Sequence, residues 1–89
     1  MIETYSLSAG EKNIRRIQHI NAQRLEGQQA YDAYVELVGS YRGDYLAAFQ
    51  AGEMARELER NDDAITWYNR ALEINPNYEP AQLARAKMQ

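Results

Sequence analysis

The chain has 89 residues, a formal net charge of −3 and 45% apolar residues, which is enough for one domain with a modest core and argues against wholesale disorder. It contains no cysteine and a single histidine, so disulfides, thiolate catalysis and cysteine-rich or histidine-rich zinc sites are excluded. Residues 1–43 hold five basic and five acidic side chains, whereas residues 44–89 hold five basic and eight acidic ones. Neither half has the basic excess that phosphate contacts require, and we expect no nucleic-acid partner.

Membrane and export signals are not found in the sequence as it stands. No apolar run approaches the roughly 20 residues of a membrane span, so we expect no membrane partner. Residues 1–16 lack the basic segment followed by an apolar stretch that marks a signal peptide, and we expect a cytoplasmic location. This expectation applies to the given sequence alone, because a chain cut from a larger protein can lack its targeting signal.

The first helix is predicted over residues 9–25, after a lead-in over residues 1–7 that shows no helical period. Ser8 and Glu11 have the spacing of a capping box, in which each side chain accepts the other residue's backbone N–H. Mostly apolar side chains then recur three or four positions apart and predict a stripe that faces the core: Ile14, Ile17, Asn21 and Leu25, with Ile20 beside it.

A second helix is predicted over residues 28–41. Gly27 interrupts the pattern before it; the alternative is one unbroken helix, because a single internal glycine costs only about 1 kcal/mol relative to alanine. Gly43 is the expected C-terminal cap. Apolar side chains again follow helical spacing: Tyr31, Tyr34, Val35, Val38 and Tyr41.

Asp44 is the expected N-cap of a third helix, which runs through YLAAFQAGEMARELER. One narrow face of this helix consists mainly of small residues: Tyr45, Ala48, Gly52, Ala55 and Leu58. Asn61 is the expected N-cap of a fourth helix, and Asp62 and Asp63 suit the positive end of its dipole. The fourth helix carries an apolar face and ends before Pro76; that face is Ala64, Ile65, Tyr68, Ala71 and Leu72.

A short fifth helix is predicted over residues 79–88, with Pro80 in its first turn and Leu83, Ala84 and Met88 as its apolar members. The fold class is therefore all-α, with about five helices in antiparallel hairpins. We divide the single domain over residues 8–89 into a helical pair at 8–43, a hairpin at 44–78 and a capping helix at 79–89.

Residues 45–78 contain small and aromatic residues at characteristic positions. The segment spans 34 residues, with the small residues Gly52 and Ala64 twelve positions apart and the aromatic Tyr68 four positions later. Further matching positions follow in the second helix: Ala71, Leu72, Ile74, Pro76 and Asn77. This pattern resembles a tetratricopeptide (TPR) repeat, a family with a 34-residue period. The resemblance implies two antiparallel helices that cross closely and form a fragment of a right-handed superhelix.

The first helix of this segment departs from the family pattern. Ala48, Ala51 and Ala55 stand where the family has tryptophan, leucine and tyrosine, and Glu59 stands at the glycine of the hairpin turn. Residues 8–43 are either a diverged repeat or an unrelated helical pair. Since about three repeats are usually needed for a self-sufficient array, either the flanking helices act as caps or the chain pairs with another copy as a homo-oligomer.

The resemblance also implies a binding surface on the concave face, lined mainly by the first helix of the repeat. The residues at such positions are Leu46, Phe49, Gln50, Glu53, Arg56 and Glu57. Phe49 is the expected anchor because aromatic side chains dominate interface energies; the alternative is that Phe49 packs as ordinary core. Trp67 lies about 100° around the helix from Tyr68 and is a second candidate for contact with a partner.

Other kinds of site are not expected. Some TPR proteins hold a peptide C-terminus with basic and amide side chains, but Glu53 and Glu57 would repel that carboxylate. A histidine without a carboxylate partner, such as His19, is usually structural or solvated rather than catalytic. The acidic residues at 57–63 are explained by a cap and a solvated face rather than by a metal. We expect no enzyme activity, no metal and no cofactor.

The sequence therefore predicts a protein–protein interaction module that binds a peptide or a partner subunit on its concave helical face. The alternative is a structural or self-associating helical domain appended to a larger protein.

Overall fold

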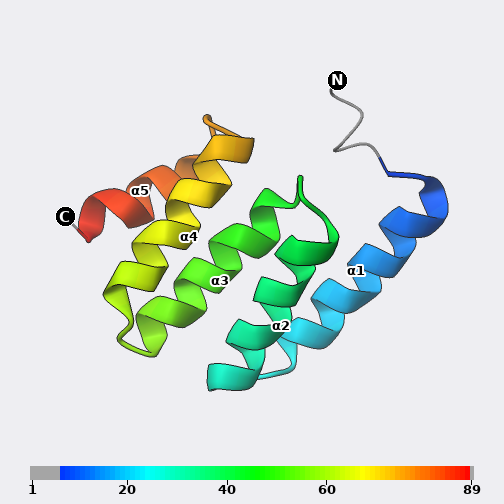
Figure 1. Ribbon diagram of the computed structural model, residues 1–89, viewed down its shortest axis with the longest axis horizontal. Coiled ribbons are helices and arrows are strands. Elements are labelled where there is room, and N and C mark those ends of the chain that lie inside the picture. The colour runs from blue at the N-terminus through cyan, green and yellow to red at the C-terminus, as the bar shows by residue number, and fades with distance from the viewer. Residues whose placement is uncertain (1–6, 89) are drawn as a thin grey trace.

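The computed structural model describes residues 7–88, which form five α-helices joined by short turns (Figure 1). The helices are α1 (Ala9–Gln23), α2 (Gly27–Ser40), α3 (Tyr45–Glu57), α4 (Asn61–Ile74) and α5 (Glu79–Lys87). This confirms the predicted all-α fold. The lead-in expected over residues 1–7 lies, apart from Leu7, outside the described residues.

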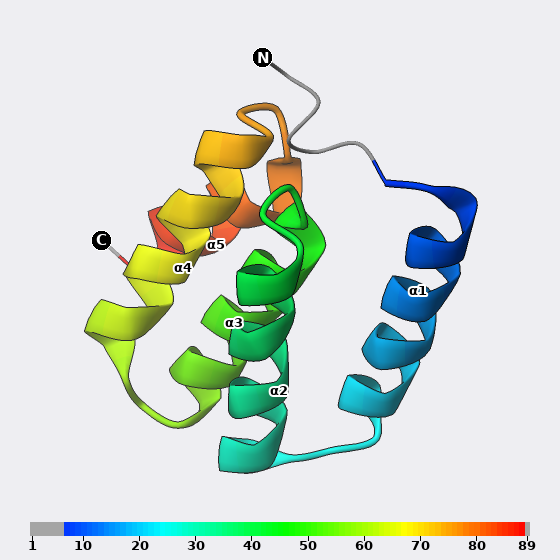
Figure 2. The ribbon, with the colours of Figure 1, turned by 45° about the vertical axis from the view of Figure 1, so that its right-hand side comes forward.

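The helices pack in chain order, each against the one before it. The α3–α4 and α2–α3 interfaces are the most extensive, and the α1–α2 interface is the least. Figure 1 shows α2, α3 and α4 side by side, with α1 at one end of the array and α5 at the other, and Figure 2 shows α1 set apart from the other helices. α3 is therefore the central helix.

Side-chain caps and one glycine confirm three of the predicted helix starts. The Glu11 N–H donates to Ser8 Oγ at 3.1 Å and the Ser8 N–H donates to Glu11 Oε1 at 2.9 Å, which is the capping box of α1. Asp44 Oδ1 accepts the Ala47 N–H at 3.0 Å at the start of α3. Gly27 opens α2 with a φ of 60°, a left-handed conformation that favours glycine and breaks the chain between α1 and α2.

Two predicted caps are wrong. Gly43 lies in the turn after α2, and Tyr41 is the C-cap, because a turn hydrogen bond from the Asp44 N–H to the Tyr41 carbonyl draws the chain out of the helix earlier. Asn61 is the first residue of α4, and Arg60 takes the N-cap position without a side-chain hydrogen bond.

The turn between α3 and α4 explains the second of these corrections. The Arg60 N–H donates to the Ala55 carbonyl at 2.8 Å and the Glu59 N–H donates to the Arg56 carbonyl at 3.0 Å. These two bonds form a Schellman motif, whose left-handed position is usually glycine. Glu59 occupies it with a φ of 61°, at the position where the resemblance expects glycine. The motif ends at Arg60, so α4 begins immediately afterwards.

Small side chains let α3 and α4 approach closely, as predicted. A Cβ atom built at Gly52 would lie 2.7 Å from Tyr68 Cε1 and 3.2 Å from the backbone oxygen of Ala64. Around this crossing the side chains that are completely buried are Ala47, Ala48, Ala51, Ala55, Ala64, Tyr68 and Ala71. The resulting interface is thin and tightly packed.

The apolar stripe of α1 is the main departure from the sequence-based expectation. The predicted core residues are exposed instead: Ile14 by 54%, Ile17 by 57%, Ile20 by 43% and Leu25 by 39%. The buried residue of α1 is Ala22. α1 stands at the end of the array and has one close helical neighbour, and His19, which binds Asp44, lies on the inward side with Ala22. Ile17 and Ile20 are consequently turned outward.

The contacts of α5 also differ in part from the prediction. Leu83 is 57% exposed, whereas Ala81 is buried. Ala84 and Met88 are half-buried and pack against the buried cluster of Ala55, Ala64 and Tyr68, as expected for apolar members of this helix. Leu83 is exposed because α5 is the last described helix and is covered on one side alone.

Candidate functional site

A groove of about 510 Å³ separates α1 from the start of α3. We call it the α1–α3 groove. The α1 wall is polar and basic, and the other wall consists of the start of α3, where Leu46 is 45% exposed. The principal lining residues are Lys12, Arg15, Arg16, His19 and Gln23 of α1, with Asp44, Tyr45 and Leu46 opposite.

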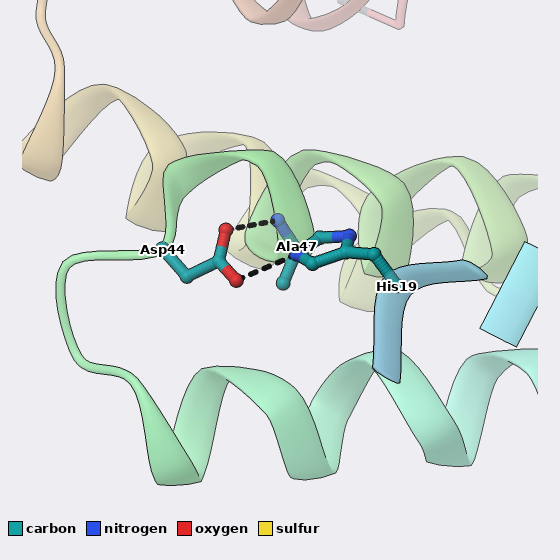
Figure 3. A network of polar contacts seen from close by, with 3 residues as sticks. All are labelled: His19, Asp44 and Ala47. Atoms are coloured by element: carbon teal, nitrogen blue, oxygen red, sulfur yellow. Dashed lines mark hydrogen bonds and ion pairs between the residues drawn. The ribbon is translucent and has the colours of Figure 1, made fainter. Parts of the chain in front are cut away.

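A buried carboxylate joins the two walls of this groove. His19 Nε2 lies 2.7 Å from Asp44 Oδ2, and Asp44 Oδ1 accepts the Ala47 N–H at 3.0 Å (Figure 3). Asp44 is only 3% exposed, so both oxygens of a buried group have partners, as burial requires. The expectation that His19 has no carboxylate partner is wrong. The partner comes from 25 positions along the chain, and no local spacing indicates it.

A second, smaller hollow of about 230 Å³ lies between α3 and α5. We call it the α3–α5 hollow. Three predicted partner-binding residues of α3 line it, namely Phe49, Glu53 and Arg56, and α5 contributes Pro80, Leu83, Ala84 and Lys87. Leu46, Phe49, Glu53 and Arg56 recur three or four positions apart and share one side of α3. The groove and the hollow therefore follow one another along that side.

Phe49 combines the two interpretations that the sequence leaves open. Its ring packs against Tyr68, with centroids 5.8 Å apart, and meets Tyr78 edge-on at 5.4 Å. Phe49 is nevertheless only half-buried, and the rest of its surface lines the α3–α5 hollow. The ring is both part of the core and part of the hollow's wall.

Glu53 organises the polar part of the same hollow. Its carboxylate accepts the Tyr68 hydroxyl at 2.5 Å and Arg56 Nη2 at 2.7 Å. Burial, together with the Glu53 carboxylate, raises the pKa of Tyr68 to about 12. The same carboxylate raises the pKa of the Arg56 guanidinium. Both carboxylate oxygens of Glu53 therefore have hydrogen-bond partners within the protein.

The two remaining predicted residues lie elsewhere. Gln50 is half-buried on α3 and lines neither the groove nor the hollow. Trp67 is half-buried on α4, where its Nε1 donates to the Tyr31 hydroxyl at 2.9 Å, and it borders a depression between α2 and α4 beside Val35 and Val38. Trp67 is therefore not brought together with Leu46, and its contact with a partner stays a prediction.

Three lining residues of the groove, Lys12, Arg15 and Arg16, are not among the residues predicted from the sequence. Their spacing with His19 and Gln23 is that of a single helix side, and this is the signal that could have indicated them. The even charge of residues 1–43 conceals the basic side of α1, because most of the acidic residues there lie outside that helix.

The groove and the hollow offer charge, hydrogen-bonding groups and exposed apolar surface. Within residues 7–88 no cluster of three or more histidine and acidic side chains could hold a metal ion. None of the helices in that range is both long enough and apolar enough to cross a bilayer.

Comparison with known families adds an independent observation. The family model for the TPR repeat matches residues 52–89. This part of the chain is therefore similar to a TPR repeat. The match covers the second half of α3 with α4 and α5, so it begins later than the repeat predicted at 45–78 and extends beyond it. The searches of curated proteins and of solved structures found no match.

The TPR match confirms the resemblance inferred from Gly52, Ala64 and Tyr68, all of which fall within the matched residues. TPR repeats are protein-interaction units, and the match supports an interaction module in general terms. Three of the predicted contact residues of α3 do not fall within it: Leu46, Phe49 and Gln50.

Proposed function

We propose that this chain binds a peptide or a partner subunit along the side of α3 that borders the α1–α3 groove and the α3–α5 hollow, and that it does so in the cytoplasm without catalysing a reaction. The observation that carries the proposal is the alignment of two adjacent cavities along one side of a central helix next to a TPR repeat. Ligand sites are typically concave, partly apolar and furnished with a few polar groups. This side of α3 combines exposed Leu46, half-buried Phe49 and charged Arg56 in that way.

The test compares partners retained on immobilised wild-type protein with those retained on variants. Leu46→Ala removes exposed apolar surface without opening the core, and Phe49→Ala removes the expected anchor. We expect both variants to lose a partner that the wild-type protein retains. The matched control is Ile17→Ala, which removes a similarly exposed apolar side chain from the outer side of α1 and should retain every partner.

Phe49→Ala also removes packing against Tyr68 and Tyr78, so the thermal unfolding of each variant must be measured beside the binding. If folded Leu46→Ala and Phe49→Ala both retain every partner, this side of α3 is not the binding surface.

Self-association is the second candidate function, and the outer side of α1 favours it. Ile14, Ile17 and Ile20 are exposed by 54%, 57% and 43%, whereas terminal elements of repeat arrays usually present a polar outer face. Size-exclusion chromatography with light scattering gives the oligomeric state. A dimer that becomes a monomer on Ile17→Glu, but not on Leu83→Glu, supports self-association through α1. A monomeric wild-type protein rejects it.

A further inference from the structure

We propose that the α1–α3 groove binds an extended acidic segment of a partner protein, with the cations of α1 contacting its carboxylates and Leu46 contacting an apolar side chain between them. This inference rests on the proposed function and deepens it by naming the chemistry of the partner. Three features of the groove favour such a ligand: its charges, its length and its apolar wall.

The basic side chains of the groove are available to a ligand. The ion pairs found within residues 7–88 join His19 to Asp44, Arg56 to Glu53 and Arg70 to Glu73, and none of them involves Lys12, Arg15 or Arg16. Three cations thus line one wall of a groove without an acidic partner in the described part of the chain. A cleft lined by charges of one sign concentrates its field and favours a ligand of opposite charge.

The acidic side chain that lines the groove, Asp44, is not available to pair with these three cations. Asp44 is 3% exposed, and its two carboxylate oxygens are already bound to His19 and to the N–H at the start of α3. An incoming carboxylate therefore meets Lys12, Arg15 and Arg16 before it meets Asp44.

The dimensions of the groove suit a short extended segment. Lys12 and Gln23 both line it, and at a rise of 1.5 Å per helical residue they lie about 16 Å apart along α1. An extended chain covers that distance with about five residues. Three separated cations exceed what one terminal carboxylate can neutralise, so the geometry favours several acidic side chains within a segment over a free C-terminus.

Two observations favour a protein segment over a nucleic acid. The groove has an apolar wall at Leu46, which is 45% exposed, and amide side chains at Asn13 and Gln23, all of which suit a peptide. The chain as a whole carries a charge of −3, with the acidic excess over residues 44–89. A long phosphate backbone that extended beyond the groove would meet that excess and be repelled.

The experiment measures binding of the full chain to a labelled, C-terminally amidated peptide of about ten residues, in which glutamates flank a central leucine. A peptide of the same length with every glutamate replaced by glutamine is the charge control. We expect the acidic peptide to bind about tenfold more tightly or better, and the difference to shrink as salt screens the charges.

Variants of the protein locate the contact. Lys12→Gln, Arg15→Gln and Arg16→Gln should each weaken binding about two- to fivefold, in line with exposed ion pairs, and the triple variant should abolish the preference for glutamate. Arg24→Gln is the matched control, because it removes the same charge at the C-cap residue of α1, which does not line the groove. Circular dichroism confirms that all five variants fold.

Several outcomes would overturn the inference. Equal binding of the two peptides, no binding of either, or an effect of Arg24→Gln as large as that of Arg15→Gln each reject the acidic segment. If a short single-stranded RNA binds more tightly than the acidic peptide, and the glutamine variants of Lys12, Arg15 and Arg16 weaken that binding, the groove is a phosphate site. An oligomer that Arg15→Gln dissociates would assign it to a second copy. If the peptide fails while Leu46→Ala and Phe49→Ala still lose a protein partner, the inference fails alone and the proposed function stands.

Discussion

At the scale of single residues, Gly52 shows how much the α3–α4 packing depends on the lack of a side chain. Glycine inside a helix normally destabilises it by about 0.5–1 kcal/mol relative to alanine. At this position the balance reverses, because a Cβ would lie 2.7 Å from the ring of Tyr68, closer than two carbon atoms can pack. The residue that costs helical stability is the one that permits the crossing.

We expect Gly52→Ala to lower the free energy of unfolding by about 1–3 kcal/mol, the usual cost of overpacking a core. Gly39→Ala is the matched control. A Cβ at Gly39 of α2 would meet nothing within 4 Å, and the substitution should stabilise the protein by about 0.5–1 kcal/mol. Urea unfolding of both variants gives the comparison, and equal effects of the same sign would contradict the close approach at Gly52.

Tyr68 gives the protein a pH dependence at alkaline pH. Its pKa is raised to about 12 by burial and by the Glu53 carboxylate, whereas an unfolded tyrosine titrates near 10. Between these values the unfolded chain releases a proton that the folded chain retains. The stabilisation is therefore complete below about pH 10 and is lost as the pH rises towards 12.

We expect the free energy of unfolding to fall from about pH 10 upward, and to fall less steeply in Tyr68→Phe. The decline should not disappear in that variant, because burial also raises the pKa of Tyr34 and of Tyr78. Denaturant unfolding at a series of pH values measures the slope, and phenolate absorbance follows the titration. An identical slope in the two proteins would contradict the assignment to Tyr68.

At the scale of the elements, the turn between α3 and α4 forms a Schellman motif although its left-handed position is not occupied by glycine. Glu59 holds the left-handed position of the Schellman motif with a φ of 61°. Left-handed backbone costs a non-glycine residue roughly 1–2 kcal/mol. The sequence lacks the expected turn glycine, yet the two flanking helices impose the same turn.

Glu59→Gly should therefore raise the free energy of unfolding by about 1 kcal/mol, measured by thermal or urea unfolding. The control is Glu36→Gly, an exposed position inside α2, where the same replacement should lower it by about 1 kcal/mol. Destabilisation by both substitutions would show that Glu59 is not strained in solution.

The attachment of α1 depends on a polar contact more than on apolar packing. α1 has the least extensive interface among the neighbouring helices, and its isoleucines face outward. The His19–Asp44 contact of 2.7 Å joins it to α3. α1 is accordingly the element expected to open most readily.

His19→Ala should increase hydrogen exchange in α1 by about tenfold, while the amides of α3 and α4 exchange as before. Such a local change corresponds to roughly 1.4 kcal/mol, within the range of about 0.5–1.5 kcal/mol for the net contribution of a hydrogen bond. The control is His19→Gln, which can still donate to Asp44 and should retain most of the protection. If exchange rises equally in all helices, α1 is not an independently opening unit.

At the scale of the whole molecule, the array of five helices and the α3–α4 crossing could be predicted from the sequence, because their signals are local. The capping box at Ser8, the cap at Asp44 and the spacing of Gly52, Ala64 and Tyr68 all act over a few positions or within one hairpin. The outward turn of the α1 isoleucines could not be predicted in the same way. Periodicity shows that Ile14, Ile17 and Ile20 lie close together on one helix, but it does not say whether a neighbour covers them.

In the candidate site, too, the features with a local sequence signal could be predicted and those formed by distant segments could not. Leu46, Phe49, Glu53 and Arg56 share a side of α3, and helical spacing alone places them together. The α1–α3 groove depends on two segments that meet across a long sequence separation, and the bond between His19 and Asp44 has no local signature. Trp67 shows the converse case, because an aromatic at a plausible helical position faces α2 rather than the side of α3 that carries the cavities.

The buried, alanine-rich face of α3 limits which substitutions this chain can accept during evolution. Ala47, Ala48, Ala51 and Ala55 have no exposed surface, so a larger side chain at any of them would overpack the core. The opposite side borders cavities, and its exposed members Leu46 and Arg56 can be exchanged without opening the core. Selection can therefore alter which molecules this helix recognises while the scaffold that presents it stays constant.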